Sequence, residues 1–237
     1  MKFAKLASMS AIALTLSFSA GAFADSHGMA VGITPTMKKL DFEHNGKKHT
    51  IFRNQDQKNT VKADFAKTSR KCPPFCIQPI SLAPGVETLG EVEVINYIEK
   101  MASGDSSILV VDSRTPDWVA KGTIPGAVNL PWTGLNPKKG AKTEGIMKIM
   151  QESFNVGLAG DADEFAVDEA IAANDTSKVF DFSNAKTLVM FCNGMWCGQS
   201  PNNIMNLLKF GYPADKIKWY RGGMQDWEIL GLSTVKP

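Results

Sequence analysis

Histidine is scarce in this 237-residue chain, which contains only three, His27, His44 and His49. The long segment after residue 49 therefore offers no imidazole that could serve as a general base. A hydrolase built on the usual cysteine–histidine pair is disfavoured for this reason. A zinc site of cysteine and histidine ligands would need distant parts of the chain to converge, and the spacings match no usual pattern.

An excess of charge of one sign is also absent. The 26 basic and 24 acidic residues give a formal net charge of +2, which falls to zero if the two lysines within residues 1–24 are removed. Proteins that bind nucleic acids normally present a basic patch or stripe. We therefore expect no nucleic-acid partner.

Long hydrophobic runs are absent beyond the first two dozen residues. Residues 1–24 begin with two lysines, continue with an apolar run over 6–18 and end in Ala22-Phe23-Ala24, a pattern typical of a secretory signal peptide. A retained membrane anchor is disfavoured, because serines interrupt the run and it is shorter than the roughly 18 apolar residues that a span needs. We expect a periplasmic protein, cleaved after Ala24, with no membrane association afterwards.

Cysteine is limited to two local pairs, Cys72/Cys76 and Cys192/Cys197. In an oxidising compartment paired cysteines are disulfides by default, so a structural bridge is the first interpretation of each pair. The spacing of Cys72 and Cys76 also resembles that of some copper-delivery proteins, since soft thiolates select Cu(I). We favour a disulfide between Cys72 and Cys76, and expect no metal or other cofactor.

Residues 25–84 differ in pattern from the rest and are expected to form a small N-terminal extension. Two strand-like runs within 40–52 are separated by Asn45-Gly46, which is a strong β-hairpin signal. The stretch 71–79 is too rich in proline for regular secondary structure. We expect the extension to wrap on the main domain and to be fastened near its cysteine pair.

Residues 85–237 alternate short apolar runs with amphipathic segments and are expected to form one α/β domain. Such alternation predicts a parallel sheet with helices on both faces. A glycine-rich, acidic stretch over 133–180, with one or two weak helices, is interpreted as an insertion. Strands are predicted at 107–114, 127–132, 187–192 and 216–221, and helices at 91–101, 201–210 and 224–232.

Cys192 ends one of the predicted strands, at the sheet edge where parallel folds place their reactive groups. A loop over 193–199 follows, and a helix is predicted to begin at Pro201 with Ser200 as its N-cap. Two glycines let the loop turn its amides inward. Those amides and the helix N-terminus favour a charged thiol, so the pKa of Cys192 should fall below its reference value of about 8.5. We expect a thiolate suited to attack sulfur.

Three ordered motifs then resemble those of the rhodanese-like sulfurtransferases. VVDSRTPDWVAKGTIPGAVNLPW contains a strand ending in Asp-x-Arg and then Gly-x-Ile-Pro-Gly-Ala, WYRGGMQDW resembles the signature near the family's C-terminus, and Cys192 falls at the family's catalytic position. The resemblance covers roughly residues 84–237. It implies a rhodanese-like fold and a Cys192 persulfide that passes its sulfur to a thiol, to a cyanide-like acceptor or to a partner protein. Asp112 and Arg114 match family positions that organise the active-site side of the sheet.

The loop departs from the family pattern in length and in charge. It is longer than usual between Cys192 and Ser200, and it carries no arginine, the next one being Arg221. The missing arginine disfavours a cysteine phosphatase, which needs one to hold phosphate. A neutral, partly apolar rim should also attract an anion such as thiosulfate less strongly. A polysulfide, an organic persulfide or a protein-bound sulfur is therefore an alternative donor.

The second cysteine of the loop, Cys197, has three interpretations: a bystander, a resolving thiol that forms a disulfide with Cys192, or the persulfide site itself. We favour an auxiliary or resolving role. Trp196 is either a lid over the persulfide or a packing residue. The expected active-site loop consists of Asn193, Gly194, Met195, Trp196, Gly198, Gln199 and Ser200.

Two other functions compete with sulfur transfer. A thiol–disulfide oxidoreductase would use Cys192 and Cys197 and could exchange with Cys72 and Cys76. A non-catalytic module would bind sulfur or a metal and take its specificity from the extension.

Overall fold

The computed structural model describes residues 28–44 and 46–237. The expected signal peptide, residues 1–24, and Asn45 of the expected hairpin turn lie outside the described residues. In the part of the chain that is described, no helix is both long and apolar enough to cross a membrane.

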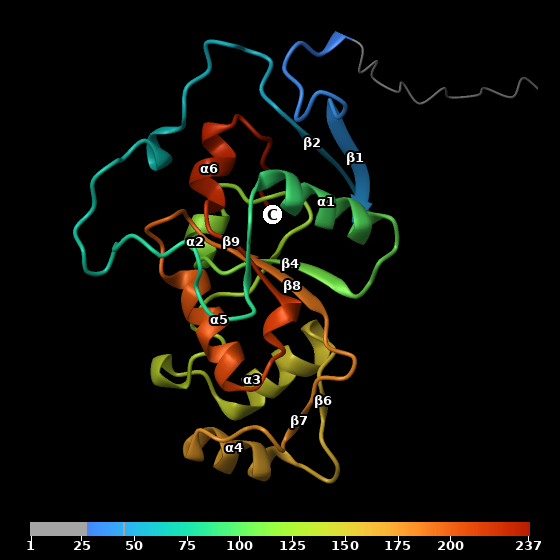
Figure 1. Ribbon diagram of the computed structural model, residues 1–237, viewed down its shortest axis with the longest axis vertical. Helices are drawn as coiled ribbons and strands as arrows, with labels where there is room; N and C mark the ends of the chain where they lie inside the picture. The colour runs from blue at the N-terminus through green and yellow to red at the C-terminus, as the bar shows by residue number, and fades with distance from the viewer. Residues whose placement is uncertain (1–27, 45) are drawn as a thin grey trace, which may run out of the picture.

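A five-stranded parallel sheet forms the centre of the molecule (Figure 1). Every neighbouring pair of strands is parallel, as the alternating pattern predicted. The strand predicted at 127–132 is shorter and spans only Val128–Asn129. In spatial order the strands are β3 (Glu87–Leu89), β9 (Ile217–Tyr220), β8 (Thr187–Phe191), β4 (Ile108–Asp112) and β5 (Val128–Asn129).

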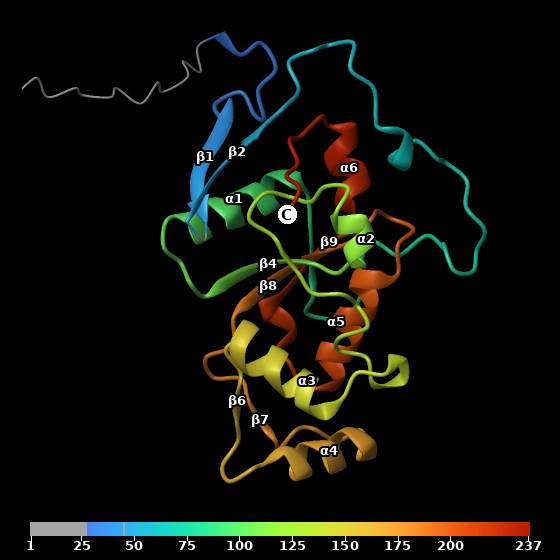
Figure 2. The ribbon, with the colours of Figure 1, turned by 180° about the vertical axis from the view of Figure 1, so that it is seen from behind.

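Helices cover both faces of this sheet, which confirms the predicted α/β architecture. α1 (Glu91–Ala102) and α6 (Gly223–Ile229) pack on one face, and α5 (Gln199–Lys209) packs on the other (Figures 1 and 2). Successive strand residues point to opposite faces, so Val110 joins the α1 side and Val111 the α5 side. Because both faces are buried, the strands consist of continuous apolar runs.

α5 begins earlier than predicted, and the difference matters for the site. Its first residue is Gln199 and its N-cap is Gly198, so Ser200 is not the cap. Pro201 is tolerated in the first turn because the amides there have no acceptor within the helix. The Ser200 hydroxyl, free of a capping role, is directed to Cys192 instead.

The segment 133–180, expected to be an insertion, contributes to the core beneath the α5 face. It contains the two helices α3 (Thr143–Lys148) and α4 (Glu164–Ala173), with a π-helical turn over Ile149–Ser153 after α3. It also contains a short 3-10 helix, Pro137–Lys139, and contributes to a small antiparallel sheet of β6 (Gly157–Leu158) and β7 (Phe180–Asp181). The fully buried side chains that it adds to the core are Leu135, Ile146, Met150, Phe154 and Val167.

The N-terminal extension contains the predicted hairpin, formed by β1 (Lys39–His44) and β2 (Lys47–Phe52). Ile51 is fully buried in the core on the α1 side, and the Ser233 amide donates to the Phe52 carbonyl. After β2 the chain passes α6 and returns towards α2 (Pro116–Val119) and the loop before α5, as the teal segment of both views shows (Figures 1 and 2). We call residues 66–82 of this segment the strap.

Candidate active site

Cys192 directly follows β8 at the carboxyl edge of the sheet, where only 3% of its surface is exposed. Its carbonyl accepts the Met224 amide at 2.9 Å, and the Asn193 carbonyl accepts the Gln225 amide at 3.0 Å. The start of α6 therefore holds the first turn of the cysteine loop in place.

This close approach depends on Gly223, whose role we did not predict. Its φ is +56°, and a Cβ atom there would lie 2.3 Å from the Cys192 carbonyl oxygen. Only glycine combines this backbone conformation with such close contact. The Gly-Gly pair of WYRGGMQDW was the available signal, but sequence spacing could not show what it touches.

The sulfur of Cys192 is surrounded by hydrogen-bond donors. The Ser200 hydroxyl donates to it at 3.1 Å and accepts the indole N–H of Trp219 at 3.2 Å, which fixes the direction of the hydroxyl proton. Burial alone would raise the pKa of this thiol. Hydrogen bonds from the Cys197 thiol, the Ser200 hydroxyl and loop amides outweigh burial and lower the pKa to about 7. Trp219 takes part through Ser200, which the sequence did not reveal.

Cys197 is an unequal neighbour of Cys192. Both are free thiols, and Cys197 is also only 3% exposed. Burial raises the pKa of Cys197 well above its ordinary value, and the adjacent Cys192 sulfur raises it further. At neutral pH the two sulfurs therefore differ: Cys192 is substantially ionised, and Cys197 remains a thiol. The Cys197 thiol donates to the Gln199 side-chain oxygen at 3.7 Å, and the Cys197 carbonyl lies 3.5 Å from the Cys192 sulfur.

Asp112 and Arg114 lie at the same sheet edge, one strand away, and brace the loop after β4. They form an ion pair at 2.6 Å in which neither side chain is more than 1% exposed. Thr123 donates to Asp112 at 2.7 Å, and Arg114 donates to the Gly122 carbonyl at 2.7 Å. The hydrogen bonds that the structure describes for the side chains of Asp112 and Arg114 all go to residues within 112–123. The pair thus shapes the neighbouring loop, which carries Trp118, and does not touch the Cys192 sulfur.

The strap crosses the cysteine loop and is hydrogen-bonded to it. The Gln78 amide donates to the Met195 carbonyl at 2.8 Å, and Arg221 donates to the Gln78 carbonyl at 2.8 Å. Cys72 and Cys76, which flank a proline-rich turn of the strap, are joined by a disulfide. An extension far away in the sequence therefore forms part of the site.

Trp196 connects the cysteine loop to this extension. Its indole N–H donates to Gln225 at 2.8 Å, and Gln225 in turn donates to the Phe65 carbonyl at 3.0 Å. The ring meets Phe75 of the strap edge-on, with centroids 5.6 Å apart. The guanidinium carbon of Arg70 lies 3.8 Å from the Trp196 ring centroid. Trp196 is thus held from three directions.

A cavity of about 390 Å³ opens between the strap and the cysteine loop. Cys197 lines it and Cys192 does not. The expectation of a neutral rim is wrong, because Arg70 adds a positive charge from outside the loop. The sequence of the loop could not indicate this, because Arg70 lies far from the loop along the chain. The lining residues are Arg70, Pro74, Phe75, Trp118, Trp132, Asn193, Trp196, Cys197, Gly198, Gln199 and Asn202.

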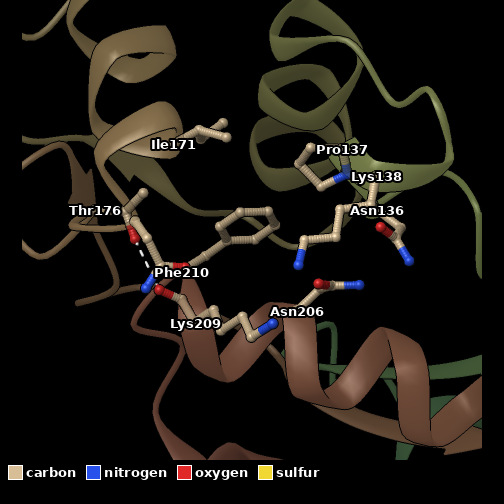
Figure 3. Close-up of a pocket in the computed structure, with 9 residues that line it drawn as sticks. Asn136, Pro137, Lys138, Ile171, Thr176, Asn206, Lys209 and Phe210 are labelled. Carbon is tan, nitrogen blue, oxygen red and sulfur yellow. Dashed lines mark hydrogen bonds between the residues drawn. The ribbon is translucent and has the colours of Figure 1, made fainter.

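A smaller cavity of about 110 Å³ lies at the C-terminal end of α5, against residues 136–138 and the end of α4. The ring of Phe210 points into it, and Thr176 donates to the Lys209 carbonyl at its edge (Figure 3). No cysteine lines this cavity. Over residues 28–44 and 46–237, no group of three or more histidine, cysteine or acidic side chains is placed to hold a metal.

A model of the Rhodanese-like domain family matches residues 95–230, which is more than half of the chain. The resemblance inferred from the three motifs is thereby confirmed. The match covers the domain and not the extension before it.

Similar solved structures are distant in sequence. A thiosulfate sulfurtransferase from Pseudomonas aeruginosa is 17% identical, with a TM-score of 0.35, and the match covers 63% of this chain and 20% of that one. A Rhodopseudomonas palustris protein of unknown function, described as a possible tyrosine phosphatase, is 20% identical, with a TM-score of 0.36 and coverage of 63% and 85%. The rhodanese-like domain of an Anabaena protein is 15% identical, with a TM-score of 0.32 and coverage of 65% and 81%. No curated protein matches the chain.

Proposed function

Because this chain belongs to the Rhodanese-like domain family, we propose that it is a sulfurtransferase in which Cys192 carries the transferred sulfur as a persulfide. The observation that carries the proposal is the set of donors around the Cys192 sulfur, which lower its pKa to about 7. A thiol with this pKa is substantially ionised at neutral pH, and the thiolate is the nucleophile.

The reaction takes place in two nucleophilic displacements. The Cys192 thiolate bonds to the terminal sulfur of a donor such as thiosulfate; the donor's sulfur–sulfur bond breaks, and its electron pair leaves with sulfite. An acceptor thiolate or cyanide then bonds to the outer sulfur of the persulfide, and the electron pair returns to Cys192. Both steps balance without an external oxidant or reductant.

The residues around the sulfur supply the stabilisation that these steps need. Negative charge sits on the Cys192 sulfur before transfer and on its persulfide afterwards. The Ser200 hydroxyl and the backbone amides of Asn193 and Ser200 stabilise the charge on the Cys192 sulfur before it attacks. Cys197 stays protonated at neutral pH, so it does not compete as a nucleophile.

Mass spectrometry tests the assignment directly. After incubation with thiosulfate or polysulfide, the loop peptide should gain the mass of one sulfur atom on Cys192. Cys192→Ser should reduce sulfur transfer to background. Cys197→Ser is the matched control and should keep the persulfide at a reduced rate. Full transfer by Cys192→Ser would reject the assignment and move the nucleophile to Cys197.

A thiol–disulfide oxidoreductase is the second candidate, favoured by the two free thiols of one loop, where the Cys192 thiol donates to the Cys197 carbonyl at 3.5 Å. In this reaction Cys192 would attack a substrate disulfide and Cys197 would resolve the mixed disulfide. A redox titration should then show a reversible Cys192–Cys197 disulfide. If no such disulfide forms over the range of reduction potentials typical of labile disulfides, this candidate is eliminated.

We propose further that the protein works in the periplasm after export. The leader-like pattern of residues 1–24 and the Cys72–Cys76 disulfide support this location, since disulfides persist in oxidising compartments. Cell fractionation with N-terminal sequencing should find the mature chain in the periplasm, starting at Asp25. Recovery in the cytoplasm with Met1 intact would contradict it.

A further inference from the structure

The cavity at the C-terminal end of α5 receives two positive charges from different parts of the chain (Figure 3). Lys138 extends into it from the short 3-10 helix Pro137–Lys139, and Lys209 extends into it from the last turn of α5. Neither lysine takes part in the ion pairs formed among residues 28–44 and 46–237. We call this space, into which both lysines point, the lysine cavity.

No carboxylate in the lining of the lysine cavity balances these charges. Among the described residues, the lining contains neither aspartate nor glutamate. Asp175, which follows the lining residue Asn174, accepts hydrogen bonds from the amide and the hydroxyl of Ser177 and does not line the cavity. Two like charges directed into one space repel each other, so the arrangement favours an anion with two negative charges between them.

Side-chain amides give the lysine cavity an acceptor in a fixed position. The Nδ2 groups of Asn206 and Asn136 donate to the Asn202 Oδ1 atom, at 3.1 Å and 2.9 Å. Because its nitrogen is engaged, Asn206 turns its side-chain oxygen towards the two lysine side chains (Figure 3). Within the described part of the chain this oxygen accepts no hydrogen bond, although Asn206 is only 9% exposed.

This acceptor distinguishes among anions that carry two negative charges. Sulfate and the dianion of a phosphate monoester have no hydrogen to donate, so either would leave the Asn206 oxygen unpaired, which is costly for a buried group. Hydrogen phosphate has two negative charges and also a P–O–H donor. It therefore matches both the lysines and the amide oxygen.

The size of the lysine cavity also points to a small ion. Its volume of about 110 Å³ is well below the roughly 300–1,000 Å³ that is usual for organic ligands. The side chains of Pro137, Ile171 and Phe210 close the remaining sides (Figure 3). A nucleotide or another molecule of cofactor size does not fit, whereas a single phosphate ion does.

We propose that the lysine cavity is a binding site for inorganic hydrogen phosphate. The ammonium groups of Lys138 and Lys209 hold the negative oxygens, and the P–O–H group donates to the Asn206 side-chain oxygen. No cysteine lines this cavity, so the site is independent of sulfur transfer through Cys192. The bound ion joins the 3-10 helix of residues 137–139 to the end of α5.

An NMR titration of the isotopically labelled protein tests the proposal with three probes: phosphate, sulfate and methyl phosphate. The ionic strength is held constant and the solution is slightly alkaline, so that all three are mainly dianions. Phosphate should shift the amide signals of Lys138 and Lys209 and reach saturation. Sulfate and methyl phosphate should bind about tenfold more weakly, because neither can donate to Asn206.

Three variants assign the contacts. Lys138→Gln and Lys209→Gln should each raise the phosphate Kd by about tenfold, the usual effect of losing a charged hydrogen bond. Asn206→Leu keeps the size of the side chain and removes the acceptor. It should bring the phosphate and sulfate affinities to within about twofold of each other, since nothing then rewards the P–O–H group.

Lys139→Gln is the matched control for Lys138→Gln. It removes the same charge from the same 3-10 helix, but Lys139 does not line the cavity, and its ammonium lies 5.7 Å from the centroid of the Trp132 ring. The phosphate Kd should stay within about twofold of the wild-type value, because surface changes of this kind are usually small.

Thermal melting provides a second readout and shows whether each variant is folded. Phosphate should raise the melting temperature of the wild type more than that of the double variant Lys138→Gln, Lys209→Gln, because only the wild type gains stability from binding. The double variant measures the general stabilisation that phosphate gives to any protein by its exclusion from the surface.

The outcomes separate this site from the proposed sulfur transfer. Phosphate shifts that never saturate, or that are confined to the cysteine loop, would overturn the inference. So would a phosphate Kd that is the same in the wild type, Lys138→Gln and Lys209→Gln. Sulfate binding as tightly as phosphate would overturn the assignment to hydrogen phosphate. None of these results bears on the Cys192 persulfide, which is measured by mass spectrometry on a different peptide.

Discussion

The two sides of the active site are built in different ways. One side is a single continuous unit: β8, the cysteine loop and α5 are neighbours in sequence, and Ser200 donates to Cys192 from only eight residues away. The other side is the strap, which reaches the loop through the Gln78–Met195 hydrogen bond and the stacking of Arg70 on Trp196. The first side supplies the chemistry, and the second determines what can approach it.

This difference suggests a division of labour that mutations can separate. Changes on the sheet side should alter the reactivity of Cys192 or the stability of the domain. Changes in the strap should alter the choice of ligand and leave the domain intact, because local segments with few buried contacts open independently of the core.

One of the two largest effects on the sheet side is expected from Gly223→Ala. The added Cβ would lie 2.3 Å from the Cys192 carbonyl oxygen, at a φ of +56°. Overpacking typically costs about 1–3 kcal/mol, and the backbone conformation costs roughly 1–2 kcal/mol more. Denaturant unfolding should show this loss, and persulfide formation should fall with it.

Gly140→Ala is the control for Gly223→Ala. Gly140 also has a positive φ, +93°, but nothing lies within 4 Å of its Cβ position. Gly140→Ala should lose only the roughly 1–2 kcal/mol of unfolding free energy that comes from the backbone conformation. Equal losses at the two positions would show that contact with Cys192 is irrelevant.

A second large effect is expected from Arg114→Met. Removing one partner of a buried ion pair leaves Asp112 uncompensated and typically costs about 3–5 kcal/mol. Lys121→Met breaks the exposed pair with Asp64, whose side chains are 48% and 51% exposed, and should cost less than about 1 kcal/mol. Chemical denaturation of both variants measures the contrast. If Arg114→Met loses less than about 1 kcal/mol of unfolding free energy, Arg114 does not brace the loop.

Ser200→Ala should change reactivity more than stability. It removes the hydroxyl that donates to Cys192, so the pKa of that thiol should rise from about 7. The alkylation rate of Cys192, followed by peptide mapping, increases with pH as the thiolate forms. Its midpoint should move up by about one pH unit, the size expected for one lost charged hydrogen bond.

Ser113→Ala provides the comparison for Ser200→Ala. Ser113 is also buried at the sheet edge, but its hydroxyl accepts from Asn203 and not from the cysteine loop. The alkylation midpoint should stay at its wild-type value. A midpoint that does not move in Ser200→Ala would exclude this hydroxyl as a stabiliser of the thiolate.

The smallest effect on the fold is expected from the double variant Cys72→Ser, Cys76→Ser. It removes the disulfide of the strap, so Arg70 and Phe75 should be less well ordered. Limited proteolysis should cut the strap faster than in the wild type, while the domain keeps its melting temperature. A lowered melting temperature would show that the two sides do not act separately.

Most of the sheet side could be predicted from the sequence. The apolar runs at 107–114 and 187–192 predicted parallel strands, and both lie at the centre of the sheet. The Asn45-Gly46 signal likewise predicted the hairpin of β1 and β2. These features depend on local periodicity, which the chain carries in its own order of residues.

The helix boundary at the site and the hydrogen-bond partners of its side chains were harder to predict from the sequence. Ser200 was expected to cap α5, whereas the helix begins at Gln199 and Ser200 donates to the Cys192 sulfur. A serine in a first helical turn can bond to its own backbone or to a neighbour, and only the neighbour's position decides between them. The same holds for Trp219, which is buried in the core and also donates to Ser200.

The sequence by itself determined the family, the parallel α/β sheet and the position of Cys192 at its carboxyl edge, because motifs and periodicity are local properties. Only the tertiary structure decided that Gly223 supports the cysteine loop, that Cys197 lines the cavity, and that Arg70 of the strap gives it a positive charge. These contacts join segments far apart in the chain. Packing and hydrogen bonding form these contacts as the chain folds, so the spacing of residues within one segment of the sequence does not reveal them.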